Sequence, residues 1–259
     1  MSFLSFRMAL PALLLLAPAL PAEDLKPEAI LDKYVEVTGG RAAYDKIQTE
    51  IDTGTFELTN MGLSGSQTSY HSKPDKSYSV IDLAGMGKAE DGSNGQVAWS
   101  NHPGQGPHIK EGDERAAALR SGALHAETHW QDFFKKAELA GTEDVAGKPC
   151  YKIVLTPNDG SPETRYYDKS SNLLVKVSMP ITTPEGSANV EIGLSDYRDE
   201  GGILTAHTIT EKLPGMDMVM KIASVKYNPD IPASRYDLPD EIKAAMAPRA
   251  PVAVDPPKK

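Results

Sequence analysis

Two histidines have a spacing that could hold a metal ion. His125 and His129 stand four residues apart, which on a helix would place both imidazoles on one face. A structural zinc ion takes four protein ligands, and the pattern His-x-Glu-x-His differs from the His-Glu-x-x-His of zinc proteases. The remaining candidates, His71, His102 and His108, lie at no fixed offset from this pair. The sequence therefore predicts no metal and no cofactor, and a secreted metal-dependent hydrolase that uses His125 and His129 is kept as an alternative.

No other motif of catalysis is complete. Residues 85–88, Gly-Met-Gly-Lys, lack the remainder of a phosphate-binding loop, and residues 62–65, Gly-Leu-Ser-Gly, are too short for a nucleophile elbow. The single cysteine, Cys150, follows Pro149 at the start of an alternating run, which favours a buried structural thiol over a nucleophile. We therefore expect a protein that is not an enzyme.

Apolar side chains of two segments are the candidate binding residues. Met216, Met218, Met220 and Ile222 alternate along one expected strand and so share a face. Flexible thioethers adapt to irregular shapes, so this face is either an ordinary core strand or the wall of a cavity for flexible apolar ligands such as acyl chains.

The second apolar segment is an expected helix over residues 128–135. It carries Trp130, Phe133 and Phe134, and a spacing of three or four residues places two of these rings on one face. The segment is either a fixed part of the core or a lid that opens over a cavity.

The elements that must position these residues are mostly strands. Pro27 opens a helix that ends at Thr38-Gly39-Gly40, and from residue 48 the apolar period changes from helical to two, with Gly54 as an expected bulge. Helical segments at 113–120 and 128–135 interrupt the strands, which resume as a meander to about residue 228. We predict a mainly β (α+β) protein with a single strongly curved antiparallel sheet. This open half-barrel has about ten strands, and helices cover its concave face.

The N-terminal residues predict export, and the C-terminal residues predict a disordered tail. In residues 1–22, Arg7 precedes an apolar run and then small residues, which is typical of a signal peptide cleaved near Ala22, with Ala19 as the alternative. Residues 23–245 form the expected domain, and the Pro-rich residues 246–259 form an expected disordered tail. The formal charge of −9, from 27 Lys and Arg against 36 Asp and Glu, argues against nucleic acid as a partner. We expect an exported, soluble monomer.

Several segments together resemble a known family. They are PEAILDKYVEVTGG at 27–40, NGQVAWSNHPGQGP at 94–107, KPCYKIVLTPNDGSPETRYYDKSSNLLVKV at 148–177, and GLSDYRDEGGILTAHTI at 193–209. Over residues 27–240 this order resembles the outer-membrane lipoprotein-sorting proteins, the LolA/LolB-like periplasmic carriers of lipid and lipoproteins. The resemblance implies a half-barrel with helices over a hydrophobic cavity that binds a lipid or acylated protein cargo in the periplasm without catalysis. An envelope membrane protein is a further expected partner. An envelope sensor or interaction module on the same fold is the alternative.

Overall fold

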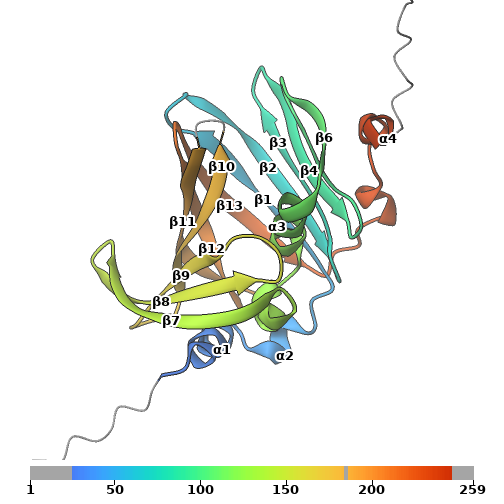
Figure 1. Ribbon diagram of the computed structural model, residues 1–259. Coiled ribbons are helices and arrows are strands. Elements are labelled where there is room, and N and C mark those ends of the chain that lie inside the picture. The colour runs from blue at the N-terminus through green and yellow to red at the C-terminus, as the bar shows by residue number, and fades with distance from the viewer. Residues whose placement is uncertain (1–24, 184–185, 247–259) are drawn as a thin grey trace, which may run out of the picture.

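One large antiparallel sheet dominates the computed structural model, which describes residues 25–183 and 186–246 (Figure 1). Thirteen strands follow one another in the order β6-β5-β4-β3-β2-β1-β13-β12-β11-β10-β9-β8-β7. Within the described part of the chain no pairing joins β6 to β7, so the sheet is not closed into a barrel. The strands are β1 (Thr49–Leu58), β2 (Leu63–Ser72), β3 (Lys76–Leu83), β4 (Gly87–Asn94), β5 (Ala98–His102), β6 (Gly106–Lys110), β7 (Phe134–Val145), β8 (Lys148–Pro157), β9 (Glu163–Asp168), β10 (Leu174–Thr183), β11 (Gly186–Glu200), β12 (Ile203–Leu213) and β13 (Met216–Tyr227).

The helices are short and lie before, between and after two runs of strands. They are α1 (Pro27–Val37), α2 (Arg41–Tyr44), α3 (Gly112–Gly122), the 3₁₀ helix η1 (Ala126–Asp132), the 3₁₀ helix η2 (Ala233–Tyr236) and α4 (Asp240–Met246). α1 begins at a proline with an acidic first turn, and glycines at 39 and 40 with positive φ follow it. Across residues 25–183 and 186–246, no helix combines the length and the apolar character needed to span a bilayer.

The pairing of β1 with β13 joins two meanders. β1 to β6 pair in sequence order, and so do β7 to β13, so this one seam brings together residues about 170 positions apart, such as Thr53 and Ser224. The register with β13 shifts between Thr53 and Gly54, so a bulge lies at the expected place, but its extra residue is Ala223 on β13, and β1 pairs with β2 without a shift. A Cβ atom at Gly54 would collide with the carbonyl oxygen of Lys221, so only glycine fits this close approach.

One face of the sheet carries α1, α3 and η1, whereas η2 packs on the opposite face, where Arg235 lies over the rings of Tyr70 and Tyr78. We call the face with α1, α3 and η1 the covered face, and it can be followed across the sheet through residues that are register partners on successive strands. Side chains of one strand alternate between the two faces, so Phe56, Asp52 and Glu50 of β1 lie on the same face as Leu58. The backbone carbonyl of Gly122, at the end of α3, lies 3.1 Å from Nδ1 of His71 on this face, and Trp130 of η1 packs against Ile153. The partners that define the level are Leu58, Met218, Glu211, Ile192, Val177, Arg165 and Ile153.

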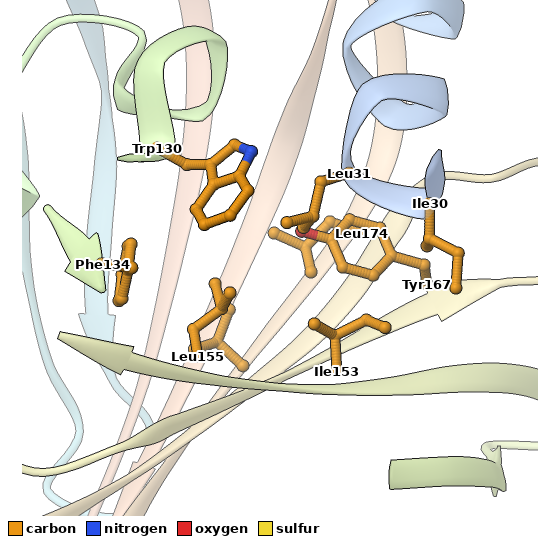
Figure 2. Close-up of a cluster of buried hydrophobic side chains, with 9 residues drawn as sticks. Ile30, Leu31, Trp130, Phe134, Ile153, Leu155, Tyr167 and Leu174 are labelled. Carbon is orange, nitrogen blue, oxygen red and sulfur yellow. The ribbon is translucent and has the colours of Figure 1, made fainter. Parts of the chain in front are cut away.

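The main core lies where α1 and η1 meet β7–β10 (Figure 2). Ile153 and Leu155 are fully buried, and each such side chain contributes about 1.5–3 kcal/mol by leaving water. The cluster holds Ile30, Leu31, Trp130, Phe134, Ile153, Leu155, Tyr167, Leu174 and Val177. Cys150 on β8 is a free, buried thiol, as expected.

Two expectations about the elements need correction. The described residues form thirteen strands rather than about ten, because residues 76–110 fold into four short strands joined by tight glycine turns. Residues 128–135 do not form one α-helix, since η1 ends at Asp132 and Phe134 already belongs to β7. The expected signal peptide at 1–22 and the Pro-rich segment after Met246 lie outside the described residues.

Candidate functional site

The alternating methionines occupy two different surroundings. Met218 and Met220 pack against the buried side chains of Phe56, Leu58 and Leu83 on the covered face, and we call these five residues the methionine patch. In the same strand, Ile222 is buried and lies beside the patch, whereas Met216 is 37% exposed at the strand's end. The structure therefore brings two of the three methionines together on one apolar surface built only from strands.

The aromatic candidates lie elsewhere. Trp130 and Phe134 belong to the main core with Ile153 and Leu155, and Phe133 packs beside them, as Figure 2 shows for the labelled residues. This cluster and the methionine patch are separate, so the structure does not bring the two sets of candidate residues into one cavity wall.

The expected helical face of His125 and His129 is not formed. His125 precedes η1 with a positive φ of 55°, and His129 has non-helical angles inside η1. Nδ1 of His129 lies 3.1 Å from the hydroxyl of Thr128, and its ring packs on Phe133. Over residues 25–183 and 186–246, no three His, Cys, Asp or Glu side chains are arranged to hold a metal ion.

A cavity of about 450 Å³ lies between α3 and strands β2–β4, at the far end of the covered face from the methionine patch. We call it the serine-lined cavity. Every second residue of these strands lies on the covered face, and most of those residues have short side chains. α3 can therefore cross this part of the sheet and leave an open volume beneath it. Its walls include Ser69, His71, Ser77, Ser79, Asp91, Ser93 and Lys110 from the strands, and Glu114, Ala117, Ala118, Ser121 and Gly122 from α3.

Asp91 is the paired carboxylate of this cavity. It lies 2.7 Å from the ammonium group of Lys110 and 2.8 Å from Nε2 of His102. Burial alone would raise the pKa of Asp91, but the hydrogen bonds and charges of His102 and Lys110 outweigh burial and hold that pKa below its usual value. The hydrogen bond to Asp91 in turn raises the pKa of His102. Asp91 thus stays ionised and already has its counter-ions.

A second cavity, of about 190 Å³, lies under α1, α2 and His125. We call it the tyrosine-lined cavity, because Tyr34, Tyr44, Tyr197 and Tyr227 contribute to its wall. Glu50, His125 and Glu127 also line it, together with Leu194, Ile203, Leu204, Thr205, Ala206 and Ile209. Nε2 of His125 lies 3.5 Å from Glu50, and its Nδ1 lies 3.6 Å from Glu127. His125 thus connects the segment after α3 to strand β1.

Two half-buried carboxylates on β1 form no ion pair with Lys or Arg among the described residues. Burial raises the pKa of Glu50, which the charges of His125 and His71 only partly oppose. Burial likewise raises the pKa of Asp52, whose Oδ2 accepts a hydrogen bond of 2.8 Å from the amide of Gln67. Glu127 differs, because its contacts with His125 and the charge of Arg165 outweigh burial and hold its pKa below the usual value.

Sequence reasoning missed these acids and the serine rows. The signal was the alternation itself, since Ser69 and His71, Ser77 and Ser79, and Asp91 and Ser93 each stand two residues apart. The alternation shows that each pair shares a face, but nothing in the sequence places the three pairs and β1 side by side.

Replacing Asp52 with Asn should raise the thermal midpoint at pH 7 by a few degrees. Burial disfavours the charged form of the Asp52 carboxylate, and the neutral amide of asparagine removes that cost. Because the pKa of Asp52 is raised in the folded state, the wild type regains this free energy as the pH falls through that pKa. The difference between the two proteins should therefore shrink towards pH 4. Midpoints measured across this range test the effect.

Glu57→Gln is the control for this measurement. Glu57 is exposed on the opposite face of the same strand, so its replacement should leave the midpoint nearly unchanged. An Asp52→Asn protein that is less stable than the wild type at pH 7 would contradict the assignment of Asp52 as an unpaired half-buried acid.

The fold and these cavities define a class of protein: an open antiparallel sheet with α1, α3 and η1 packed over one face and hollows beneath them. No protein-family model matches the sequence, and no curated protein matches it either. Solved structures do match. A DUF1329 family protein from Desulfovibrio piger aligns with a TM-score of 0.57 and 17% identity over 82% of this chain and 97% of that one.

Two further structures place the fold more narrowly. A LolA superfamily protein from Nitrosomonas europaea aligns with a TM-score of 0.56 and 14% identity over 83% of this chain and 98% of that one. An outer membrane lipoprotein-sorting protein domain from Vibrio parahaemolyticus aligns with a TM-score of 0.53 and 13% identity over 79% and 97% of the two chains. The chain therefore has the LolA/LolB-like fold, which confirms the resemblance seen in the sequence at the level of the fold.

Proposed function

We propose that this protein is an exported, non-catalytic binding or carrier protein for an amphiphile, either a lipid or the acyl chains of a lipoprotein. In this proposal the apolar chain lies on the methionine patch, and the polar end lies towards the serine-lined and tyrosine-lined cavities. The helices over these hollows cover the concave side of the sheet. A periplasmic location and a monomeric state complete the proposal, with an envelope membrane protein that delivers or receives the cargo.

One observation carries the proposal: a single face of β1–β3 changes from apolar to polar along its length. On β1 the residues of this face run Leu58, Phe56, Gly54, Asp52, Glu50. Residues two apart on a strand are about 7 Å apart, so the apolar and polar ends are separated by roughly the length of a short amphiphile.

The strands beside β1 change in the same way. On β2 the face passes from Leu63 and Gly65 through Gln67 to Ser69 and His71, and on β3 it passes from Leu83 and Ile81 to Ser79 and Ser77. A face with this gradient matches a ligand that is itself apolar at one end. The names of two fold neighbours, a LolA superfamily protein and a lipoprotein-sorting domain, agree with cargo of this kind.

Binding energy is available without catalytic chemistry. Burying an apolar chain gives about 0.8 kcal/mol for each methylene, so one acyl chain supplies affinity without a constellation of polar contacts. The methionines and the short side chains of the cavity walls allow chains of different shape.

Purified protein should bind neutral single-chain amphiphiles, and dye displacement tests this. N-phenylnaphthylamine, a neutral probe that fluoresces in apolar sites, should brighten on mixing, and dodecyl maltoside should displace it. Native mass spectrometry of protein purified from envelope extracts should show a bound lipid mass. A protein that neither brightens the probe nor carries any lipid would contradict the proposal.

A further inference from the structure

The tyrosine-lined cavity and the acids beside it have an excess of acceptors over donors. Glu50 and Asp52 stand two residues apart on the covered face of β1, and no Lys or Arg forms an ion pair with either among the described residues. Glu50 contacts His125, and Asp52 has the amide of Gln67 and the hydroxyl of Ser69 nearby. The charge of His71 acts weakly on both acids. Burying unpaired charge costs free energy unless a cation or a proton meets it.

Two buried polar atoms at this place have no partner. Gln67 is 3% exposed, and its amide nitrogen faces Asp52 and Ser69 while its Oε1 accepts no hydrogen bond. Nε2 of His125 is also buried without a hydrogen bond, although it lies beside Glu50 on the wall of the tyrosine-lined cavity. Buried polar atoms are seldom left unsatisfied. The Gln67 oxygen lacks a donor, and the nitrogen of His125 on the cavity wall lacks a partner of either kind.

The aromatic rings favour the same kind of ligand. Four tyrosines line the cavity, with the ring of Tyr44 at 4.7 Å and that of Tyr227 at 6.1 Å from the ring of His125. Aromatic faces attract ammonium groups, and carboxylates near them add the opposite charge. The other acid of the wall, Glu127, is already balanced by His125 and Arg165, so Glu50 on the wall and Asp52 beside it remain to be neutralised.

We infer that this cavity binds the ammonium group of a positively charged amphiphile, with Glu50 on its wall and Asp52, two residues along the same face of β1, as its counter-ions and the tyrosines around it. This inference rests on the proposed function and names the chemistry of the ligand's polar end. A primary ammonium offers three donors, which the carboxylates of Glu50 and Asp52 can accept. The serine-lined cavity is less suited to this role, because its carboxylate Asp91 already has Lys110 and His102.

Four amphiphiles with the same dodecyl chain separate the contributions of chain and head. Dodecylammonium, dodecyltrimethylammonium, dodecyl sulfate and dodecyl maltoside each displace N-phenylnaphthylamine from the wild-type protein below their micelle concentrations. We expect the two ammonium compounds to bind about tenfold tighter than dodecyl maltoside. Dodecyl sulfate should bind more weakly than the other three compounds. A wild-type protein that binds all four equally, or that prefers the sulfate, would overturn the inference and leave the proposed function standing. Failure of all four to bind would overturn both.

Variants locate the preference. Glu50→Gln and Asp52→Asn keep the shape of each side chain, so each should reduce the ammonium preference several-fold and the double variant should abolish it, with maltoside affinity unchanged. Glu57→Gln, on the opposite face of β1, should keep the full preference.

Glu211→Gln tests a competing position. Glu211 lies opposite Met218 on the covered face, and burial raises the pKa of this acid too. Loss of the preference in Glu211→Gln, with the double variant at Glu50 and Asp52 unaffected, would overturn the assignment to the tyrosine-lined cavity. Thermal midpoints of all variants show that the compared proteins are folded.

Discussion

Replacing Trp130 with Ala should lower the free energy of unfolding by about 3–5 kcal/mol, as is usual for a large buried aromatic side chain. Trp130 is 6% exposed and packs with Phe134, Ile153 and Leu155, so its removal leaves a cavity in the main core. In a chain of this size the thermal midpoint should fall by roughly 6–20 °C. The indole nitrogen of Trp130 has no hydrogen-bond partner, which offsets part of the loss and favours the lower end of the range.

Urea unfolding of the variant decides whether η1 is core or lid. Met86→Ala is the control, because Met86 is exposed in the turn between β3 and β4 and should cost little. A loss below ~1 kcal/mol for Trp130→Ala, together with faster uptake of N-phenylnaphthylamine, would show that the segment opens as a lid.

Replacing Met220 with Asp should weaken the binding of dodecyl maltoside by at least about tenfold. Met220 lies opposite Phe56 on β1 and Ile209 on β12, so a carboxylate there would lose its hydration when an apolar chain covers the patch. The effect should be the same for all dodecyl amphiphiles with neutral or negative heads, because it acts on the chain. Displacement titrations measure it directly.

Two comparisons make this result specific. Met86→Asp introduces the same charge on an exposed turn and should leave the affinity unchanged. Met220→Leu restores an apolar side chain of similar volume and should bind nearly as well as the wild type. Equal affinity in Met220→Asp and the wild type would mean that the chain of the ligand lies elsewhere.

Local signals in the sequence predicted most of the elements. Pro27 and the glycines at 39 and 40 bound the first helix, and Gly54 marks the bulge at the seam. Asn94-Gly95 joins β4 to β5 with a positive φ at the glycine. These signals are reliable because each depends on the backbone geometry of one or two residues.

The helix expected at 128–135 failed for the opposite reason. Its aromatic spacing fits a helical face, but the segment instead ends a 3₁₀ helix and enters the edge strand β7. Packing of Trp130 and Phe134 into the same core from two different elements outweighs the local preference.

The sequence by itself determined the class of fold, most of its helices and strands, and which residues of each strand share a face. Alternation has a period of two whatever the neighbours are, so it can be read along the chain. Only the tertiary structure decided which faces meet. The pairing of β1 with β13 places Phe56 and Leu58 beside Met220 and Met218, and the path of the chain through α3 and η1 brings His125 to Glu50. These contacts join residues far apart in the sequence. The hydrophobic period and the secondary-structure propensity are properties of neighbouring residues, so they do not indicate which distant segments meet.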